Sequence, residues 1–383
     1  MNGRQTYSID QIKDMLLTQP EAVIERFAPP VEGSYTDKGR YFTLNPGRVD
    51  RSVGSFFVWV SGSTPGKWRD FATGEHGDIL DLIRLNLGCS LADAIKEARQ
   101  ILGLDNDTPE ARRLRNKAAA EARQRRQEAD RQRRAQAKKQ RKRAQALWLS
   151  GKERIAGTPV EGYLRDVRGI NLRQLGRQPR VLRYVRQCFY THTDPETGEV
   201  IERDYPAMVA AVTNGKGETV ACHRTYLATN QATGRWDKAP VPNAKKVLGD
   251  YAGGTIHLWS GTGPRGGKGG SLSKAAPGTR VFIAEGIEDA LSCAMLLPDE
   301  RVLAAISLSN FGQVELPDNV SAVTLIADQD ENDQAKAALE RAIAAHRDAG
   351  RSVSLWQNRH GGKDLNDALR QMQGQNDELR SVG

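Results

Sequence analysis

Acidic side chains follow three apolar runs in the C-terminal part of the chain. Glu285 stands at the end of the run RVFIAEG, and Asp289 comes one helical turn later. Asp328 and Asp330 directly follow SAVTLIA, and Asp364 follows SVSLW after a Gly-Gly-Lys turn. Carboxylates brought together would repel one another unless cations neutralised them, and hard oxygen ligands select Mg²⁺ or Mn²⁺ over zinc. The pattern therefore predicts a divalent-metal site, without zinc, of the type that performs phosphoryl chemistry.

The elements that must position these acids can be read from the same segment. The runs RVFIAEG, RVLAAIS, SAVTLIAD and SVSLW are typical of buried strands, and IEDALSCAMLL and DQAKAALERAIAAHRDAG have helical spacing. This alternation predicts an α/β sheet with parallel strands, and ligands bind at the carboxyl edge of such sheets. A single Asp-x-Asp at a strand end is more often a turn or a helix cap. Three acidic motifs in order, each after an expected strand, favour a functional site.

Residues 279–370 resemble the Toprim domain that bacterial replicative primases share with topoisomerases and some nucleases. EGIEDALS matches the Glu-Gly motif of that domain, and IADQDEND matches its Asp-x-Asp motif. The resemblance implies that Glu285 is the general acid/base of nucleotidyl transfer and also contacts the metals. It implies that Asp328 and Asp330 are catalytic metal ligands, with Asp289 and Asp364 as further ligands.

The segment 147–278 and one departure from the bacterial pattern point to the primases of phages and plasmids. Bacterial replicative primases carry a second Asp where this chain has Asn366, with Asp367 next, and the Lys-Asp-x-Asn-Asp arrangement looks like that of phage and plasmid enzymes. GTPVEGYLRDVRGI, YPAMVAAVTNGKGETVACHRTYL and KKVLG resemble the N-terminal part of their polymerase core, which implies a basic face for template and nucleotide. For each basic residue, ordinary surface charge remains the alternative. The candidates are Arg165, Arg168, His223, Arg224, Lys245, Lys246 and Lys363, with Arg224 favoured because it lies in a strand-like run between apolar neighbours.

The N-terminal segment, residues 1–106, is similar to the zinc-ribbon domain that begins such primases. SFFVWV, GKWRDFATGEHGDILDLI and SLADAIKEARQILGL carry the similarity, but the cysteine ligands are missing. Cys89 and His76 cannot build a four-ligand zinc site on their own. We therefore expect a metal-free relative of the ribbon, with Trp59, Trp68 and Phe71 stacking on single-stranded DNA. The alternative, that these rings form the core of a small domain, is slightly favoured for Trp59 and open for Trp68.

The basic charge of the chain is concentrated in the segment 107–146. The 383 residues carry a net charge of +9, but 15 basic and four acidic residues fall between Glu110 and Ala146, so the remainder is slightly acidic. This distribution excludes a generally basic nucleic-acid coat. From Glu110 to Ser150 there is no Gly, Pro or β-branched residue, which predicts a helix, and Leu114 is the only large apolar residue before Leu147, which predicts that no face of it is buried. The candidate DNA-binding residues are Arg125, Arg126, Arg133, Arg134, Lys138, Lys139, Arg141, Lys142 and Arg143.

These segments predict a multidomain α/β protein. The expected order is a ribbon-like α+β domain (1–106), a basic helical linker (107–146), the N-terminal part of a primase core (147–278), a Toprim domain (279–370) and a polar tail (371–383). The loop 261–278, rich in Gly, Lys and Ser, has no apolar periodicity and no assigned role. No run approaches the ~20 apolar residues of a membrane helix. Four scattered cysteines and a polar N-terminus favour a cytoplasmic protein with no membrane partner.

The sequence thus predicts a DNA primase, a nucleotidyltransferase that makes short RNA primers on single-stranded DNA. Its ligands would be the DNA template, nucleoside triphosphates and two Mg²⁺ or Mn²⁺ ions, and because no ATPase motif follows residue 370, a replicative helicase would be a separate partner. One alternative is a Toprim-type nuclease that uses the same acids for hydrolysis. The other is a catalytically inactive accessory protein that binds single-stranded DNA.

Overall fold

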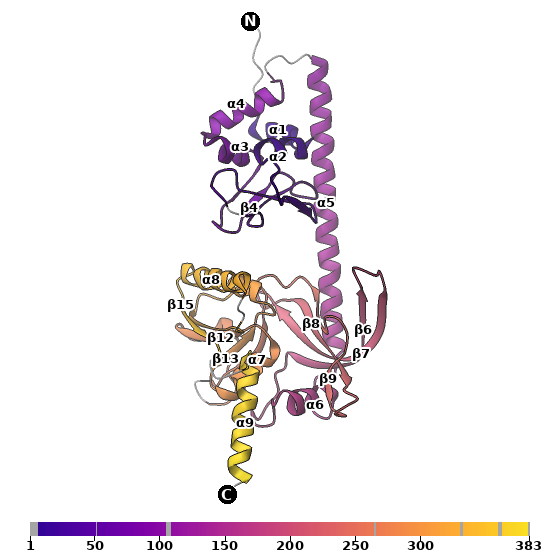
Figure 1. The fold of residues 1–383 in the computed structure, drawn as a ribbon, viewed down its shortest axis with the longest axis vertical. Coiled ribbons are helices and arrows are strands. Elements are labelled where there is room, and N and C mark those ends of the chain that lie inside the picture. Colours follow the sequence, from indigo (N-terminus) through magenta and orange to yellow (C-terminus); the bar gives the residue numbers. More distant parts are fainter. Residues whose placement is uncertain are drawn as a thin grey trace. The chain divides into compact units, whose positions relative to one another are not determined.

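The computed structural model of the chain describes residues 7–50, 52–104, 109–263, 266–329, 332–358 and 362–381. The chain divides into two compact units, Met1–Gln136 and Ala137–Gly383, and each is built from helices packed on sheets (Figure 1). One of the sheets contains parallel strands. The expected mixed α/β class is therefore confirmed. No helix among the described residues is long and apolar enough to span a membrane.

The first unit packs four short helices against an antiparallel sheet with the strand order β1-β2-β3-β4-β5. Its core joins Phe56 and Val58 of the sheet to Ile12, Ile24 and Leu80 of the helices. The helices begin where side chains cap free amides, as at α3, and the first helical run is broken at its proline. The elements are α1 (Ile9–Leu16), α2 (Pro20–Phe27), β1 (Tyr35–Asp37), β2 (Arg40–Thr43), β3 (Phe56–Trp59), β4 (Trp68–Asp70), β5 (His76–Gly77), α3 (Ile79–Leu87) and α4 (Leu91–Ile101).

The aromatic residues of this sheet are divided between core and surface. Trp68 is only 5% exposed, and its ring packs 5.6 Å from that of Phe56. The prediction that Trp68 stacks on DNA was therefore wrong, because its ring completes the core. Trp59 is partly buried edge-on against Phe57, whereas Phe71 is 44% exposed. DNA stacking by Trp59 or Phe71 stays a prediction.

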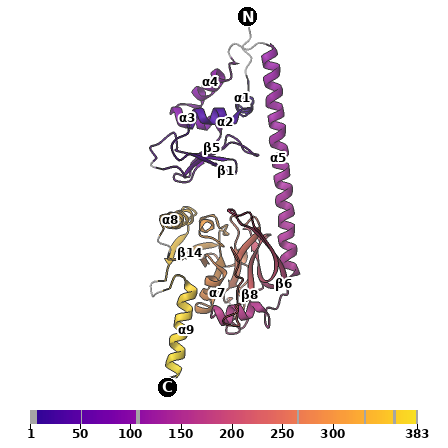
Figure 2. The same cartoon turned by 45° about the vertical axis from the view of Figure 1, so that its right-hand side comes forward.

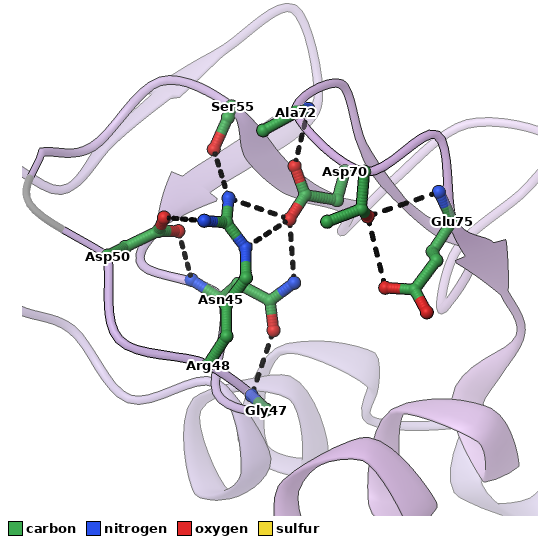
Figure 3. Close-up of polar contacts among 9 residues, drawn as sticks. Asn45, Gly47, Arg48, Asp50, Ser55, Asp70, Ala72 and Glu75 are labelled. Carbon is green, nitrogen blue, oxygen red and sulfur yellow. Dashed lines mark hydrogen bonds and ion pairs between the residues drawn. The ribbon is translucent and has the colours of Figure 1, made fainter.

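A buried ionic network fixes the loop between β2 and β3 to the end of β4 (Figure 3). Asp70 is fully buried and accepts hydrogen bonds from Asn45 Nδ2 at 2.7 Å and from Arg48 Nε at 3.0 Å. Arg48 also contacts Asp50 and donates to Ser55. Burial alone would raise the pKa of Asp70, but the hydrogen bonds from Asn45, the Ala72 amide and Arg48 outweigh it and lower the pKa.

Removing Asp70 should destabilise the first unit and change its response to acid. Asp70→Ala leaves Arg48 with Asp50 as its only carboxylate in this network and leaves the buried Asn45 amide without its acceptor, at an expected cost of about 1–3 kcal/mol in the free energy of unfolding. Because the folded-state pKa of Asp70 is lowered, its contribution is present above the ordinary aspartate pKa and is lost as the pH falls below it. Urea unfolding of Asp70→Asn from neutral to acid pH should show a flatter decline than the wild type. Glu32→Gln, at an exposed site, serves as the control, and equal acid slopes in all three proteins would contradict the assignment.

The basic segment forms one helix, α5 (Pro109–Ser150), which contributes residues to both units. In the first unit Ala119 is buried in the core and Arg126 pairs with Asp14. In the second unit Ala144 is fully buried, and Arg141 donates to the Thr219 carbonyl at 3.0 Å. The prediction that no face is buried was wrong, because alanines supply contacts that a search for large apolar residues misses. Arg126 and Arg141 are engaged within the protein. The other candidate residues, Arg125, Arg133, Arg134, Lys138, Lys139, Lys142 and Arg143, are exposed.

The second unit begins with an antiparallel sheet of order β10-β8-β7-β6, with β9 paired to β8. The odd-numbered residues of β8, such as Ala221 and Leu227, face one core, and the even-numbered ones, such as Cys222 and Tyr226, face another. This alternation decides which basic side chains face the next domain. The elements are α6 (Pro159–Gly162), a π-helical turn η2 (Tyr163–Val167), β6 (Leu182–Thr193), β7 (Val200–Thr213), β8 (Thr219–Thr229), β9 (Trp236–Lys238) and β10 (Lys245–Gly249).

The C-terminal sheet has the order β11-β13-β12-β14-β15, in which β11 is antiparallel and the other four strands are parallel. Helices α7 and α8 cover opposite faces, since α7 packs with Phe282 and Ala284, and Ala342 of α8 packs with Val281 and Ile283 (Figure 2). The predicted parallel sheet is confirmed. The elements are β11 (Ile256–Ser260), η3 (Leu272–Lys274), β12 (Thr279–Ala284), α7 (Ile287–Leu296), β13 (Arg301–Ala304), η4 (Leu308–Gln313), β14 (Val320–Ile326), α8 (Asp333–Asp348), β15 (Ser352–Trp356) and α9 (Leu365–Ser381).

Candidate active site

The carboxyl ends of β12 and β14 lie side by side and carry the first two acidic motifs. The strands pair in register up to Ala284 and Ile326, so Glu285 and Asp328 follow directly on neighbouring strand ends. From here the chain turns to β13 after β12 and to β15 after β14, which opens a crevice of the kind where α/β sheets bind ligands. Asp330, the second acid of the Asp-x-Asp motif, lies outside the described residues.

Asp289 and Asp364 lie near these strand ends, and we call the group formed by Glu285, Asp289, Asp328 and Asp364 the acidic edge. Asp289 is 8% exposed in the first turn of α7 and accepts a hydrogen bond from the Asn366 amide at 3.0 Å. Asp364 precedes α9 and accepts from the Asp367 amide at 2.8 Å, which is a helix cap. Burial, and then the negative charges of Asp364 and Asp328, raise the pKa of Asp289 to about 7. The negative charges of Asp364 and Asp328 are thus close enough to oppose the ionisation of Asp289.

The donor chemistry of this edge fits a hard divalent cation. In the part of the chain that the structure describes, no three His, Cys, Asp or Glu side chains are close enough to hold an ion together, and that part does not include Asp330. The residues present are carboxylates, the oxygen ligands that Mg²⁺ and Mn²⁺ prefer. The repulsion that raises the pKa of Asp289 is what a bound cation would relieve. Metal binding by these residues stays a prediction.

The turn before α9 brings Lys363 to this edge. Its ammonium lies 3.4 Å from Asp328 Oδ2, and its backbone carbonyl accepts from the Gln329 amide at 3.1 Å. Asp367 holds the turn by accepting from the Lys363 amide at 2.9 Å. Asn366 is only 1% exposed, and its Nδ2 donates to the Arg168 carbonyl and to Ser292 Oγ. The position at which this chain departs from the bacterial pattern is therefore occupied by a buried side chain, Asn366, that is hydrogen-bonded within the protein.

A second cluster of charged side chains surrounds Glu288, the residue that precedes Asp289 in α7. Glu288 is only 5% exposed; its Oε1 accepts from the Tyr163 hydroxyl at 2.7 Å and its Oε2 from Lys245 Nζ at 2.8 Å. Lys238 lies 4.0 Å away, and Arg168 Nε donates to the Tyr163 hydroxyl at 3.0 Å. Burial alone would raise the pKa of Glu288, but the charges of Lys245 and Lys238 outweigh it and lower the pKa well below its usual range.

Sequence reasoning missed Glu288, although it found Asp289 beside it. Both acids lie in the first turn of α7, and nothing local shows which of them packs against the preceding sheet. The missing information is tertiary, because Tyr163 and Lys245 come from segments 125 and 43 residues earlier in the chain. The one available signal was a second acid inside an otherwise apolar helical run.

Gly286 lies where Lys245 meets the acidic edge. A Cβ atom at Gly286 would lie 3.8 Å from Lys245 Nζ and 3.3 Å from Asp289 Oδ2. The ammonium, the turn after β12 and the buried carboxylate therefore meet at one point. Two of the expected cations, Lys245 and Lys363, are placed at the acidic edge, and Arg168 reaches the Glu288 group through Tyr163.

The remaining candidates for nucleotide or template binding are elsewhere. His223 is 5% exposed, and burial followed by the charge of Lys245 lowers its pKa to about 4, so the prediction that it contacts nucleotide or template was wrong: the ring is neutral and enclosed. Arg224 and Lys246 lie opposite each other on β8 and β10 and face away from Glu288, toward the rings of Tyr226 and Tyr190. Arg224 and Lys246 therefore share the face of the sheet opposite to the one that carries Lys245. Arg165 is exposed and pairs with its neighbour Asp166.

Two parts of the chain match known domain families. Residues 138–258 match a domain of unknown function (DUF7146), and residues 280–375 match the Toprim domain. No curated protein matches the sequence.

Several solved primases are similar in structure. The zinc-binding and RNA polymerase domains of the Aquifex aeolicus primase are 14% identical, with 96% of this chain and 84% of that chain covered and a TM-score of 0.37. The primase fragment of the bacteriophage T7 primase-helicase is 15% identical, with 56% and 72% covered and a TM-score of 0.31. A DNA primase domain from Pseudomonas aeruginosa is 12% identical, with 60% and 75% covered and a TM-score of 0.35. Values this low do not establish the activity of this chain. The segment that carries the acidic edge, residues 280–375, is a Toprim domain.

Proposed function

We propose that the chain is a DNA primase that synthesises short RNA primers on single-stranded DNA. The observation that carries this proposal is the placement of Glu285, Asp289, Asp328 and Asp364 at one edge of the Toprim sheet, with two ammonium groups beside them. Acids alone would suit hydrolysis as well as synthesis. The added cations suit an enzyme that must also hold the triphosphate of an incoming nucleotide.

Each residue has a stated task in this proposal. Glu285 accepts the proton of the 3′-hydroxyl that attacks the α-phosphate of the incoming nucleotide, and pyrophosphate leaves. Asp328 and Asp330 would hold the metals, with Asp289 and Asp364 as further ligands. Bound Mg²⁺ or Mn²⁺ would stabilise the charge that develops on the transferred phosphoryl group. The ammonium groups of Lys245 and Lys363 contact the triphosphate, and a separate replicative helicase is the expected partner.

A nucleotide-incorporation assay tests the proposal. The chain is incubated with single-stranded DNA, Mn²⁺ and labelled ribonucleotides, and the sizes of products and template are followed. Labelled products that lengthen and require the template support a primase. A template that shortens without incorporation identifies a nuclease, and binding without either reaction under any metal identifies an accessory protein.

Neutralising the exposed face of α5 should weaken DNA binding without touching the acidic edge. Replacing Arg133, Arg134, Lys138 and Lys139 by Gln removes four exposed cations, while Arg126 and Arg141, which the protein uses internally, are kept. The slope of log affinity against log salt should become shallower by about 0.7 for each phosphate of a single strand that α5 no longer neutralises. Fluorescence anisotropy with labelled oligothymidylate measures it. An unchanged affinity and slope would mean that α5 is only a solvated spacer.

A further inference from the structure

A second hollow lies at the opposite edge of the Toprim sheet from the acids. It is a pocket of about 700 Å³ lined by the start of β13, by β11, by residues 177–181 and by residues 268–272 of the loop after β11, and the proposed function has no use for it. Arg301 begins β13 and pairs with Ser260 at the end of β11, whereas the acidic edge lies beyond Ala304 and its partner Ala284. The pocket and the acidic edge are therefore separate sites within the second unit.

The lining of this pocket is positively charged. It includes Arg177, Arg180, Lys268 and Arg301, and it includes no Asp or Glu. Among the residues that the structure describes, none of these four cations forms an ion pair with a carboxylate. Burial lowers the pKa of Arg301, which shows that its charge lies in surroundings that disfavour it. An anion bound in the pocket would compensate all four charges.

Two of the guanidinium groups are held in place by the loop 261–278. Arg177 donates to the Gly261 carbonyl at 2.8 Å and lies over the ring of Trp259, with its Cζ 4.0 Å from the ring centroid. Arg301 donates to the Gly270 carbonyl at 2.8 Å. The loop itself is pressed against β11, since a Cβ atom at Gly269 would lie 2.1 Å from the Ser260 carbonyl oxygen. Each guanidinium has further N–H donors besides the one that binds the carbonyl.

We propose that this pocket binds the phosphate groups of a nucleotide, either free or within a nucleic-acid strand, at a site distinct from the acidic edge. Fixed guanidinium forks match the oxygen atoms of phosphate in pairs, and the side chains of Arg180 and Lys268 add charge without fixed geometry. The loop 261–278 then has a role, because its carbonyl groups aim the two arginines. A pocket of this volume is large enough to enclose several phosphate groups rather than a single carboxylate.

The test measures binding by the full chain in EDTA, so that metals do not hold a triphosphate at the acidic edge. Binding of a free nucleotide is measured by calorimetry with ATP. Binding of a strand is measured by fluorescence anisotropy with a short labelled oligothymidylate, in the variant whose α5 charges are neutralised. Arg180→Glu with Lys268→Glu reverses two exposed charges and should raise the dissociation constant for at least one probe by about tenfold or more. Arg347→Glu, an exposed reversal outside the pocket, should leave both constants unchanged.

The outcomes separate the possibilities. Loss of ATP binding identifies a free nucleotide as the ligand, and loss confined to the oligonucleotide identifies a strand. If the pocket reversal binds both probes as Arg347→Glu does, or if polyglutamate competes as well as the oligonucleotide, the proposal is overturned. Should the double reversal lower the melting temperature, Lys268→Gln and Arg180→Gln carry the same test with a smaller expected loss. The same loss must appear in an Asp328→Ala background, so that a failure of the proposed primase activity leaves this measurement interpretable.

Discussion

Replacing Asp328 and Asp330 together by Ala should abolish metal-dependent primer synthesis while leaving DNA binding intact. Asp328 ends the strand next to Glu285, and its carboxylate contributes to the charge that raises the pKa of Asp289. Without these acids the segment after β14 lacks the two carboxylates that we propose as metal ligands. The rate should fall by at least about a hundredfold to a thousandfold, the scale of loss when groups that stabilise transition-state charge are removed.

The control variant makes the same Asp-to-Ala change at a position away from the acidic edge. Asp318→Ala removes an exposed acid before β14 and should retain wild-type synthesis. Rates are measured from labelled product at saturating template, and affinity for oligothymidylate is measured separately by anisotropy. Synthesis that survives in the double variant would show that the acidic edge is not the reaction centre.

Replacing Glu288 should have the largest effect on the stability of the second unit. Glu288→Ala removes the acceptor of Tyr163 and the only carboxylate that the described residues place against both Lys245 and Lys238. Tyr163 is fully buried and its hydroxyl would lose its acceptor, which costs about 1–3 kcal/mol in the free energy of unfolding, whereas Lys245 is exposed and its charge would be solvated. Urea unfolding of the full chain should show this loss, and Glu340→Ala, an exposed acid of α8, should stay within about 0.5 kcal/mol of the wild type.

A double-mutant cycle distinguishes a charge effect from a packing effect. Glu288→Leu combined with Lys245→Met removes both charges of a pair whose carboxylate is buried and whose ammonium is exposed. Residues in contact show coupling energies of about 0.5–3 kcal/mol, so the double variant should recover part of the stability that Glu288→Leu loses alone. Additive losses would mean that the two residues do not interact as their 2.8 Å separation indicates.

The sequence predicted the Toprim segment well because its signals are local. Apolar runs ending in acids predict strands, and parallel strands bring their carboxyl ends to one edge, so Glu285 and Asp328 could be placed together from pattern alone. Strand alternation in β8 and β10 also predicts that Arg224 and Lys246 lie on the opposite face from Lys245, and they do face away from the site.

Other features could not be predicted because they depend on contacts between distant segments. Which acid of α7 turns inward is decided by Tyr163 and Lys245, and the burial of Trp68 depends on helices that pack on its sheet. The docking of α5 relies on Ala119 and Ala144, which carry no periodic signal in an alanine-rich helix. The cationic pocket combines a loop without periodicity with residues from several segments that lie far apart in the chain.

The most direct test of the central claim is template-dependent ribonucleotide incorporation by the wild-type chain with Mn²⁺ or Mg²⁺. The account predicts labelled products that grow with time, require single-stranded DNA and disappear on addition of EDTA. Shortening of the template without incorporation, or no reaction with either metal, would contradict it.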